Sequence, residues 1–424
     1  MKQFLYWCLC VPFMLSMSVP PLAADATDGN ILTLEQAISL ALDSETVSQS
    51  FEYRAEGFEE EAVAAGGLPD PKLKLGAMNF PTDTFDRDQE PMTQLQVGVV
   101  QLFPRGSSRT IKSQINNDKA EKSRHMASDA RLMAARDVSK YWLELYYWLQ
   151  AEIIVEQSRG WFSNLVGVTE SRYRVGSATQ QDVVQSELEL NRLTDRLEGI
   201  RIKQDMSRSD LSRWIGALAS MRNLPKVLPI ISPPATLIST PVLGSHPVIQ
   251  AKDAEIQLNT DSVELSRQAY KPGFALDVTY GDRSGQNPDN SDRANFLSAM
   301  VLMDIPLFTN KRQDKKLASS LQKLEAVKQD RETAVRTLSS KLQRARSSLR
   351  ILERQILLYR DKLVPQSSSH SELALKAYEN SRVEFDSVMR ARVAELDTQL
   401  KAIRLEVDRA QTIAMLNYLA GEAK

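Results

Sequence analysis

The chain has 424 residues, which is enough for a large core or for two domains. Its formal net charge is −1 at pH 7, so the overall charge gives no support for binding to nucleic acid or to an anionic lipid surface. The only two cysteines, Cys8 and Cys10, lie near the N-terminus. The rest of the chain therefore needs no disulfides and cannot use thiolate chemistry.

The N-terminus has the layout of a secretory signal peptide. Lys2 precedes an apolar run over residues 4–17, and small residues follow at Ala23 and Ala24. The run is shorter than the roughly 18 residues of a spanning helix, which argues against a membrane anchor. We expect residues 1–24 to be the signal peptide.

The remaining chain is predicted to hold two copies of one pattern, offset by about 200 residues. The first repeat covers residues 25–223 and the second covers residues 248–424. A linker over residues 224–247 contains six prolines. Because proline fixes φ and removes a hydrogen-bond donor, this linker is expected to be extended.

Each repeat begins with a helix. In the first repeat, Thr33 and Gln36 have the spacing of a capping box, and apolar residues then follow on one helical face. This helix is predicted to run to about Ala65, before two glycines and a proline-rich stretch. The matching helix of the second repeat is predicted over residues 248–270.

Two strands follow the helix in each repeat. Three of the four strands alternate apolar with polar or small residues, as a strand with one lipid-facing side would. The last strand is apolar on both faces, so its outward face is not assigned. The loops 81–92 and 282–295 are long and polar, which is typical of the outer side of a membrane barrel. The strands are predicted over residues of about 72–80, 93–103, 273–281 and 296–305.

Four strands are too few to close a barrel, because about eight are needed. An open sheet would expose unpaired edges to lipid. We therefore expect other copies of the chain to complete the sheet, and three copies would supply twelve strands.

Long helical hairpins complete the repeats, over residues 107–220 and 311–420. Leucine and other apolar residues recur there at alternating spacings of three and four, which predicts coiled-coil seams. Gly160 and Pro365 are predicted to break the outgoing helices before the turns. Gly176 is expected to supply the left-handed backbone that ends a helix, and Ser177 or Thr179 to cap the returning one.

These motifs, in this order, resemble the TolC-like family, the outer-membrane factors of tripartite efflux systems. The resemblance covers essentially the whole mature chain. It is carried by Leu-Thr-Leu-Glu-Gln-Ala at 32–37, Gln-Leu-Phe-Pro-Arg-Gly at 101–106, Ile-Pro-Leu-Phe at 305–308 and Val-Pro-Gln at 364–366. The family's hairpin-tip motif is matched by Tyr173, Gly176, Thr179, Asp182, Val183 and Val184. A looser second copy comprises Tyr378, Ser381, Glu384, Ser387, Val388 and Met389.

The resemblance implies a mainly α protein with a membrane β-barrel part. A homotrimer would close a twelve-stranded barrel in outer-membrane lipid and a twelve-helix periplasmic tunnel. The tunnel would dock on a periplasmic adaptor that links it to an inner-membrane pump. The shape looks most like the branch that serves heavy-metal and cation pumps.

The chain shows no catalytic, cofactor or metal-binding pattern. His125, His246 and His370 are scattered, without acidic partners at metal-ligand spacing. There is no glycine-rich phosphate loop. We therefore expect a passive channel without a cofactor, rather than an enzyme, with a gate or adaptor-docking site at the hairpin tips. The candidate residues are Tyr173, Arg174, Gly176, Asp182, Tyr378, Ser381, Arg382 and Asp386.

Two other readings remain open. A periplasmic coiled-coil adaptor would explain the helices and the signal peptide, but not the duplicated strand pairs. A secreted coiled-coil scaffold would leave the strands and the polar loops unexplained. The exported substrate cannot be named from the sequence.

Overall fold

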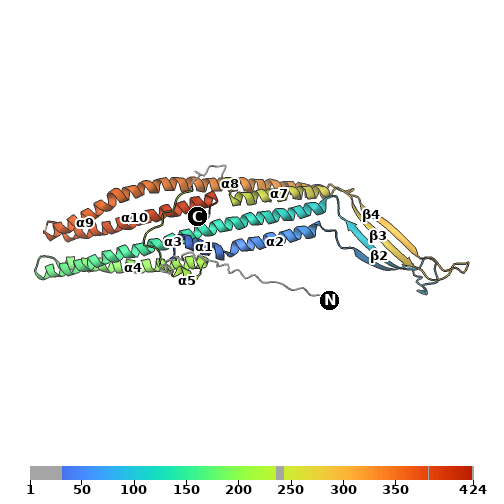
Figure 1. The fold of residues 1–424 in the computed structure, drawn as a ribbon, viewed down its shortest axis with the longest axis horizontal. Coiled ribbons are helices and arrows are strands. Elements are labelled where there is room, and N and C mark those ends of the chain that lie inside the picture. Colours follow the sequence, from blue (N-terminus) through green and yellow to red (C-terminus); the bar gives the residue numbers. More distant parts are fainter. Residues whose placement is uncertain (1–30, 235–242, 381, 423–424) are drawn as a thin grey trace, which may run out of the picture.

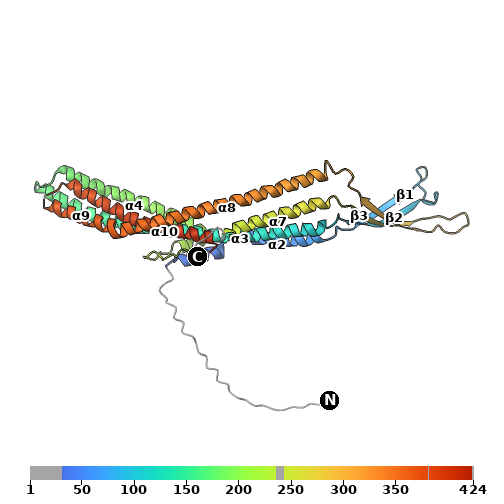
Figure 2. The ribbon, with the colours of Figure 1, turned by 90° about the horizontal axis from the view of Figure 1, so that it is seen from above.

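The computed structural model describes residues 31–234, 243–380 and 382–422, which form an elongated molecule (Figure 1). Helices run along the body and a four-stranded sheet extends from one end, as a second view confirms (Figure 2). The predicted signal peptide and part of the proline-rich linker lie outside the described residues. Within the described ranges, no helix has the length and apolar character of a membrane span.

Each half of the chain contains a pair of strands with helices before and after it. In the first half the elements are α1 (Leu34–Ser44), α2 (Thr46–Gly66), β1 (Lys72–Met78), β2 (Gln94–Phe103), α3 (Ser108–Arg174), α4 (Gln180–Ile215) and α5 (Ala217–Ser220). In the second half they are α7 (Pro247–Gln268), β3 (Gly273–Asp282), β4 (Phe296–Asp304), α8 (Gln313–Leu358), a π-helical turn η1 (Tyr359–Leu363), α9 (Val364–Glu379) and α10 (Phe385–Ala420).

The prediction of one helix up to Ala65 is wrong, because the helix is interrupted at Glu45. The backbone of Glu45 is extended, with φ −71° and ψ 112°. Its carboxylate accepts hydrogen bonds from the N–H groups of Val47, at 2.7 Å, and Ser48, so it caps a new helix. Glutamate is not among the usual N-cap residues, so the sequence pattern did not predict that a second helix begins after Glu45. The predicted capping box at the start of α1 is present.

The predicted helix break at Gly160 is also wrong, and near Pro365 the structure has a π-helical turn inside a continuous helical segment rather than a break. Helix α3 runs through Gly160 without interruption. A helical glycine costs only about 1 kcal/mol, and the following Phe162 and Leu165 are buried in the core. Pro365 instead removes a backbone donor, and the helix widens into η1 just before it.

The sheet has the strand order β1-β2-β3-β4, and every neighbouring pair is antiparallel. Strand β1 ends at Met78, earlier than predicted, because Asn79 has a positive φ of 56°. The register places apolar side chains of all four strands on one face. The larger apolar side chains of that face are Leu73, Leu75, Leu95, Val97, Val99, Phe103, Phe274, Leu276, Val278, Tyr280, Leu297, Val301 and Met303.

This register assigns the face that the sequence left open for the fourth strand. Val301 pairs with Leu276 and so lies on the apolar face, while its neighbour Met300 pairs with Asp277 on the opposite face. The opposite face is polar in the middle strands. There Asp277 is buried and forms an ion pair with Lys74 at 2.8 Å. The sheet therefore has one apolar and one partly polar face.

Helix α3 lies at the centre of the body. It packs against α2, α4, α7 and α10, and its Trp142 is fully buried, where the indole N–H donates to the Leu32 carbonyl at 3.1 Å. Helices α10 and α7 follow one another along the body between α3 and α8 (Figure 1). They meet where the His246 ring lies 3.1 Å from the Tyr418 carbonyl.

Two carboxyl groups meet between α3 and α7. Asp118 is 2% exposed and lies close to Asp261 across the helix interface. Each carboxyl group also accepts one hydrogen bond from a glutamine on its own helix, Gln114 or Gln257. Burial raises the pKa of Asp118 to about 6, assisted by the negative charges of Asp261 and Glu121. Asp118 therefore keeps its proton at mildly acid pH.

The substitution Asp118→Asn is expected to flatten the pH dependence of stability. Because folding raises this pKa, the contribution of Asp118 is fully present below about pH 4 and is lost as the pH rises through about 6. The melting temperature of the parent should therefore fall more than that of the variant as the pH rises from about 5 to about 8. The exposed-acid variant Asp210→Asn is the control, and a parent-like pH profile for Asp118→Asn would contradict the raised pKa of Asp118.

Candidate functional site at the hairpin tips

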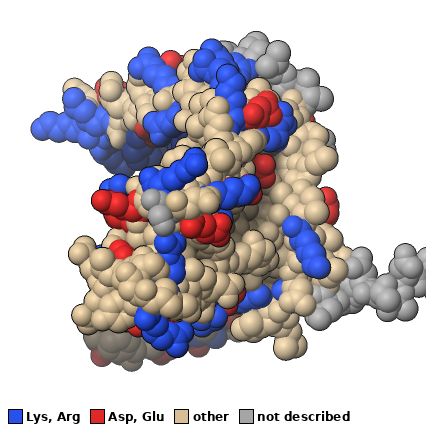
Figure 3. Space-filling model, turned by 90° about the vertical axis from the view of Figure 1, so that its left-hand side faces the viewer, with Lys and Arg blue, Asp and Glu red and all other residues tan. Residues whose placement is uncertain are grey.

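Two helical turns lie together at the end of the body that is far from the sheet (Figure 1). One joins α3 to α4, and the other joins α9 to α10. Seen from that end, Lys and Arg side chains gather along the upper edge, and acidic side chains lie scattered among uncharged residues (Figure 3). This end carries the predicted gate residues.

The first turn is built by a glycine and a capping box. Gly176 has a φ of +74°, the left-handed conformation predicted for it, and its N–H donates to the Tyr173 carbonyl at 2.9 Å. Of the two candidate caps, Thr179 is the one used. Its hydroxyl accepts from the Asp182 N–H at 3.2 Å, and the Asp182 carboxylate accepts from the Thr179 N–H at 2.9 Å.

The second turn has weaker local support. Helix α9 ends at Glu379, and the Arg382 N–H donates to the Ala377 carbonyl at 2.8 Å. Helix α10 begins after Glu384, whose side chain forms no capping hydrogen bond. Ser381, which stands where the first turn has glycine, lies outside the described residues. The two turns therefore differ in how their returning helices start.

An arginine of the first hairpin covers a tyrosine of the second. The guanidinium of Arg172 lies 4.4 Å from the centre of the Tyr378 ring and donates to the Tyr378 carbonyl at 3.1 Å. Tyr378 is buried, and its ring meets Phe385 edge-on at 5.6 Å. Burial raises the pKa of the Tyr378 phenol, so this tyrosine stays neutral. A cation over an aromatic face is attractive, and this contact joins the two hairpins.

A second contact joins the hairpins through an amide. The Gln185 side chain of α4 donates to the Asp386 carboxylate of α10 at 3.1 Å. Asp386 also pairs with Arg390 of its own helix at 2.5 Å. Farther from the turn, Arg196 pairs with Asp397 at 3.0 Å. Charged and polar groups thus connect α4 to α10 within one chain.

The sequence named only some of the residues that make these contacts. Two of the predicted residues contact the first hairpin: Tyr378 contacts Arg172, and Asp386 contacts Gln185. Neither Arg172 nor Gln185 was predicted from the sequence. The predicted Tyr173 is 47% exposed. Arg172 lies just before the first residue of the tip motif, Tyr173. Gln185 belongs to no distinctive sequence pattern. The spacing of residues therefore did not indicate either partner.

The remaining predicted residues point elsewhere in the single chain. Arg174 donates to the Ser171 hydroxyl at 3.2 Å, and Arg382 is exposed. Asp182 is held by its capping box, yet its charge still acts on Tyr378. Across the described part of the chain, no group of three or more His, Cys, Asp or Glu side chains could hold a metal ion.

The fold is that of outer-membrane channels. The chain is similar to the outer membrane protein VceC of Vibrio cholerae, with a TM-score of 0.77 and 17% identity over 92% of this chain and 97% of that one. It is also similar to CusC, with a TM-score of 0.77 and 13% identity over 92% of each chain. The CmeC outer membrane channel of Campylobacter jejuni gives a TM-score of 0.77 and 12% identity over 92% of this chain and 85% of that one.

One family model matches the second half of the chain. Residues 239–422 match the family model described as outer membrane efflux protein. This match covers less than half of the chain. No curated protein matches the chain in sequence.

Removing the cap of α4 is expected to loosen the first turn. Thr179→Ala deletes the hydroxyl that accepts from the Asp182 N–H, at a cost of about 1 kcal/mol. Amide hydrogen exchange at residues 180–183 should then become roughly fivefold faster. Ser177→Ala, which removes the alternative hydroxyl two residues earlier, is the matched control. Equal exchange in the two variants would show that Thr179 is not the cap.

Proposed function

We propose that three copies of this chain form a passive outer-membrane channel. The channel carries substrates from the periplasm to the exterior as part of a tripartite efflux system. The family-model match over residues 239–422 and the fold support an efflux channel rather than an enzyme. They do not favour the alternative of a periplasmic adaptor.

The observation that carries this proposal is the open sheet with an apolar face. Strands β1 and β4 each have a neighbour on one side only, so their outer edges offer unpaired N–H and C=O groups. In a bilayer such groups must find partners. Pairing β4 of one copy with β1 of the next satisfies both edges and closes a twelve-stranded barrel, in which the apolar face meets lipid.

The helices would continue this barrel as a tunnel. Strand β2 leads into α3 after a short connection, and β4 leads into α8. Helix α3 has 67 residues, or about 100 Å at 1.5 Å per residue. The hairpin tips would thus reach far into the periplasm, where they would dock on an adaptor and its inner-membrane pump. The pump would select the substrate, and the equal TM-scores favour no branch of the family.

The two faces of β4 provide the sharpest test. Val301→Arg places a charge on the apolar face and should destabilise the assembled channel by about 2–4 kcal/mol if that face meets lipid. Met300→Arg, one residue away on the other face, should be tolerated. The measurement is the temperature at which a heat-resistant trimer from the outer-membrane fraction dissociates. Equal loss in both variants, or a parent protein that is monomeric, would contradict the proposed barrel.

We further propose that the hairpin tips form a gate and the adaptor-docking site. The predicted residues would line it, namely Tyr173, Arg174, Gly176, Asp182, Tyr378, Ser381, Arg382 and Asp386. The two contacts that already join the hairpins support a closed tip. Charged hydrogen bonds of this kind are strong enough to hold a closed state and weak enough for a partner to break.

Single-channel conductance tests the gate. The double variant Arg382→Ala, Asp386→Ala removes charges at the second turn but leaves the α4 capping box intact, so the entrance should open and the conductance should rise. The control is Glu156→Ala, Arg159→Ala, which removes an exposed ion pair within α3. Conductance equal to that of the parent in the first variant would refute the gate.

A further inference from the structure

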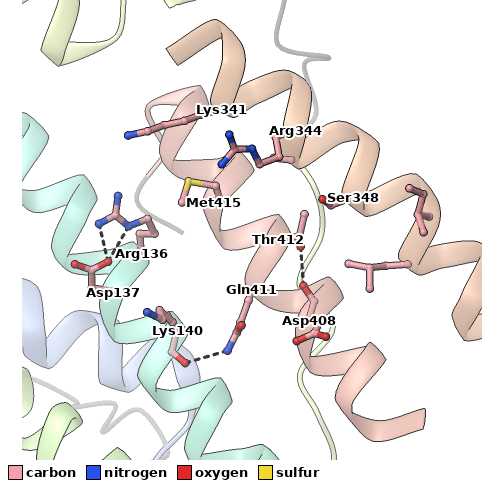
Figure 4. A pocket seen from close by; sticks show the side chains of 13 residues that line it. Arg136, Asp137, Lys140, Lys341, Arg344, Ser348, Asp408, Gln411, Thr412 and Met415 are labelled. Carbon is pink, nitrogen blue, oxygen red and sulfur yellow. Dashed lines mark hydrogen bonds and ion pairs between the residues drawn. The ribbon is translucent and has the colours of Figure 1, made fainter. Parts of the chain in front are cut away.

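A pocket of about 810 Å³ lies in the middle of the body, far from both the sheet and the hairpin tips. Helix α3 supplies one wall, α8 the other, and α10 lies between them (Figure 4). Pockets of this size hold drug-sized ligands. Neither the channel proposal nor the gate proposal uses it.

Positive charge dominates the polar lining. Four lining residues are basic and two are acidic, and both acids already have partners. Asp137 pairs with Arg136 at 2.7 Å, and Asp408 pairs with Arg404 at 2.8 Å.

Three further cations line the pocket, namely Lys140, Lys341 and Arg344, and the charge of Lys341 acts on the Asp129 carboxylate. None of them forms an ion pair among the residues that the structure describes. Figure 4 shows Lys341 and Arg344 extending from α8 over Met415 towards α3. Like charges in one pocket repel each other, and an anion between them would relieve that repulsion.

The rest of the lining is apolar. Ala345, Leu352 and Met415 form part of the pocket wall, together with Ile351, which is 47% exposed. The exposed isoleucine lies next to the cations, so the pocket has a positively charged part and an apolar part. One would receive a negative group, and the other would receive hydrocarbon.

We propose that this pocket binds an amphipathic anion, with its carboxylate, sulfonate or phosphate between Arg344, Lys341 and Lys140. Its apolar body would lie on Ile351, Leu352 and Met415. The occupant is a soluble molecule rather than a bilayer lipid. Arg136 lies 28 residues into α3 from Ser108, which places the pocket about 42 Å along the helix from the sheet end.

Calorimetric titration of the intact channel with octanoate tests the site. The protein is held in nanodiscs of zwitterionic lipid, and a dissociation constant on the order of 1 mM is expected. Butyrate lacks the tail and octanol lacks the charge, so both should bind at least about tenfold more weakly. Raising the salt concentration should weaken octanoate binding.

Charge-removing variants locate the site. Lys341→Gln, Arg344→Gln should weaken octanoate binding by about tenfold or more. Arg350→Gln, on the same helix but outside the pocket lining, should bind like the parent. Both arginines and the lysine are exposed, so folding should be retained, which circular dichroism checks.

Several outcomes would overturn the proposal. These are no octanoate binding by the parent, equal binding by the double variant and the parent, or equal binding of octanoate and octanol. Loss of binding when the nanodiscs contain anionic phosphatidylglycerol would instead identify a lipid as the occupant. The titration does not depend on conductance, so its failure would leave the channel proposal intact.

Discussion

The backbone hydrogen bonds at the two edges of the sheet constrain the rest of this molecule. Strands β1 and β4 have one neighbour each, and the apolar face beside them spans all four strands. A chain with this sheet cannot satisfy its edges alone in lipid. In the proposed channel, the number of copies, the path of the long helices and the distance between the membrane and the hairpin tips all depend on how those edges are paired.

The body adds a second constraint, since one helix organises most of the packing. Helix α3 packs against α2, α4, α7 and α10. The sheet, the mid-body pocket and the first hairpin tip all lie along this one helix. Polar groups enter this packing in pairs. Asp118 meets Asp261, and Arg172 meets Tyr378. Such buried pairs specify how the helices align, because leaving one partner without the other is costly.

Local signals in the sequence predicted local structure well. The capping box of Thr33 and the left-handed Gly176 were both predicted, because each depends on atoms only a few residues apart. The failures have equally specific causes. Glu45 caps a helix although glutamate rarely does so, and Gly160 stays helical because its buried neighbours outweigh a cost of about 1 kcal/mol.

The sequence by itself therefore determined the order of the elements, the alternation of three strands and the turn chemistry of the first hairpin. Only the tertiary structure decided which face of the last strand joins the apolar surface, since that depends on its register against β3. It also decided which side chains connect the hairpins and which basic residues meet in the pocket. Those contacts join residues about 200 or more positions apart, and the spacing of residues along the chain carries no information about them.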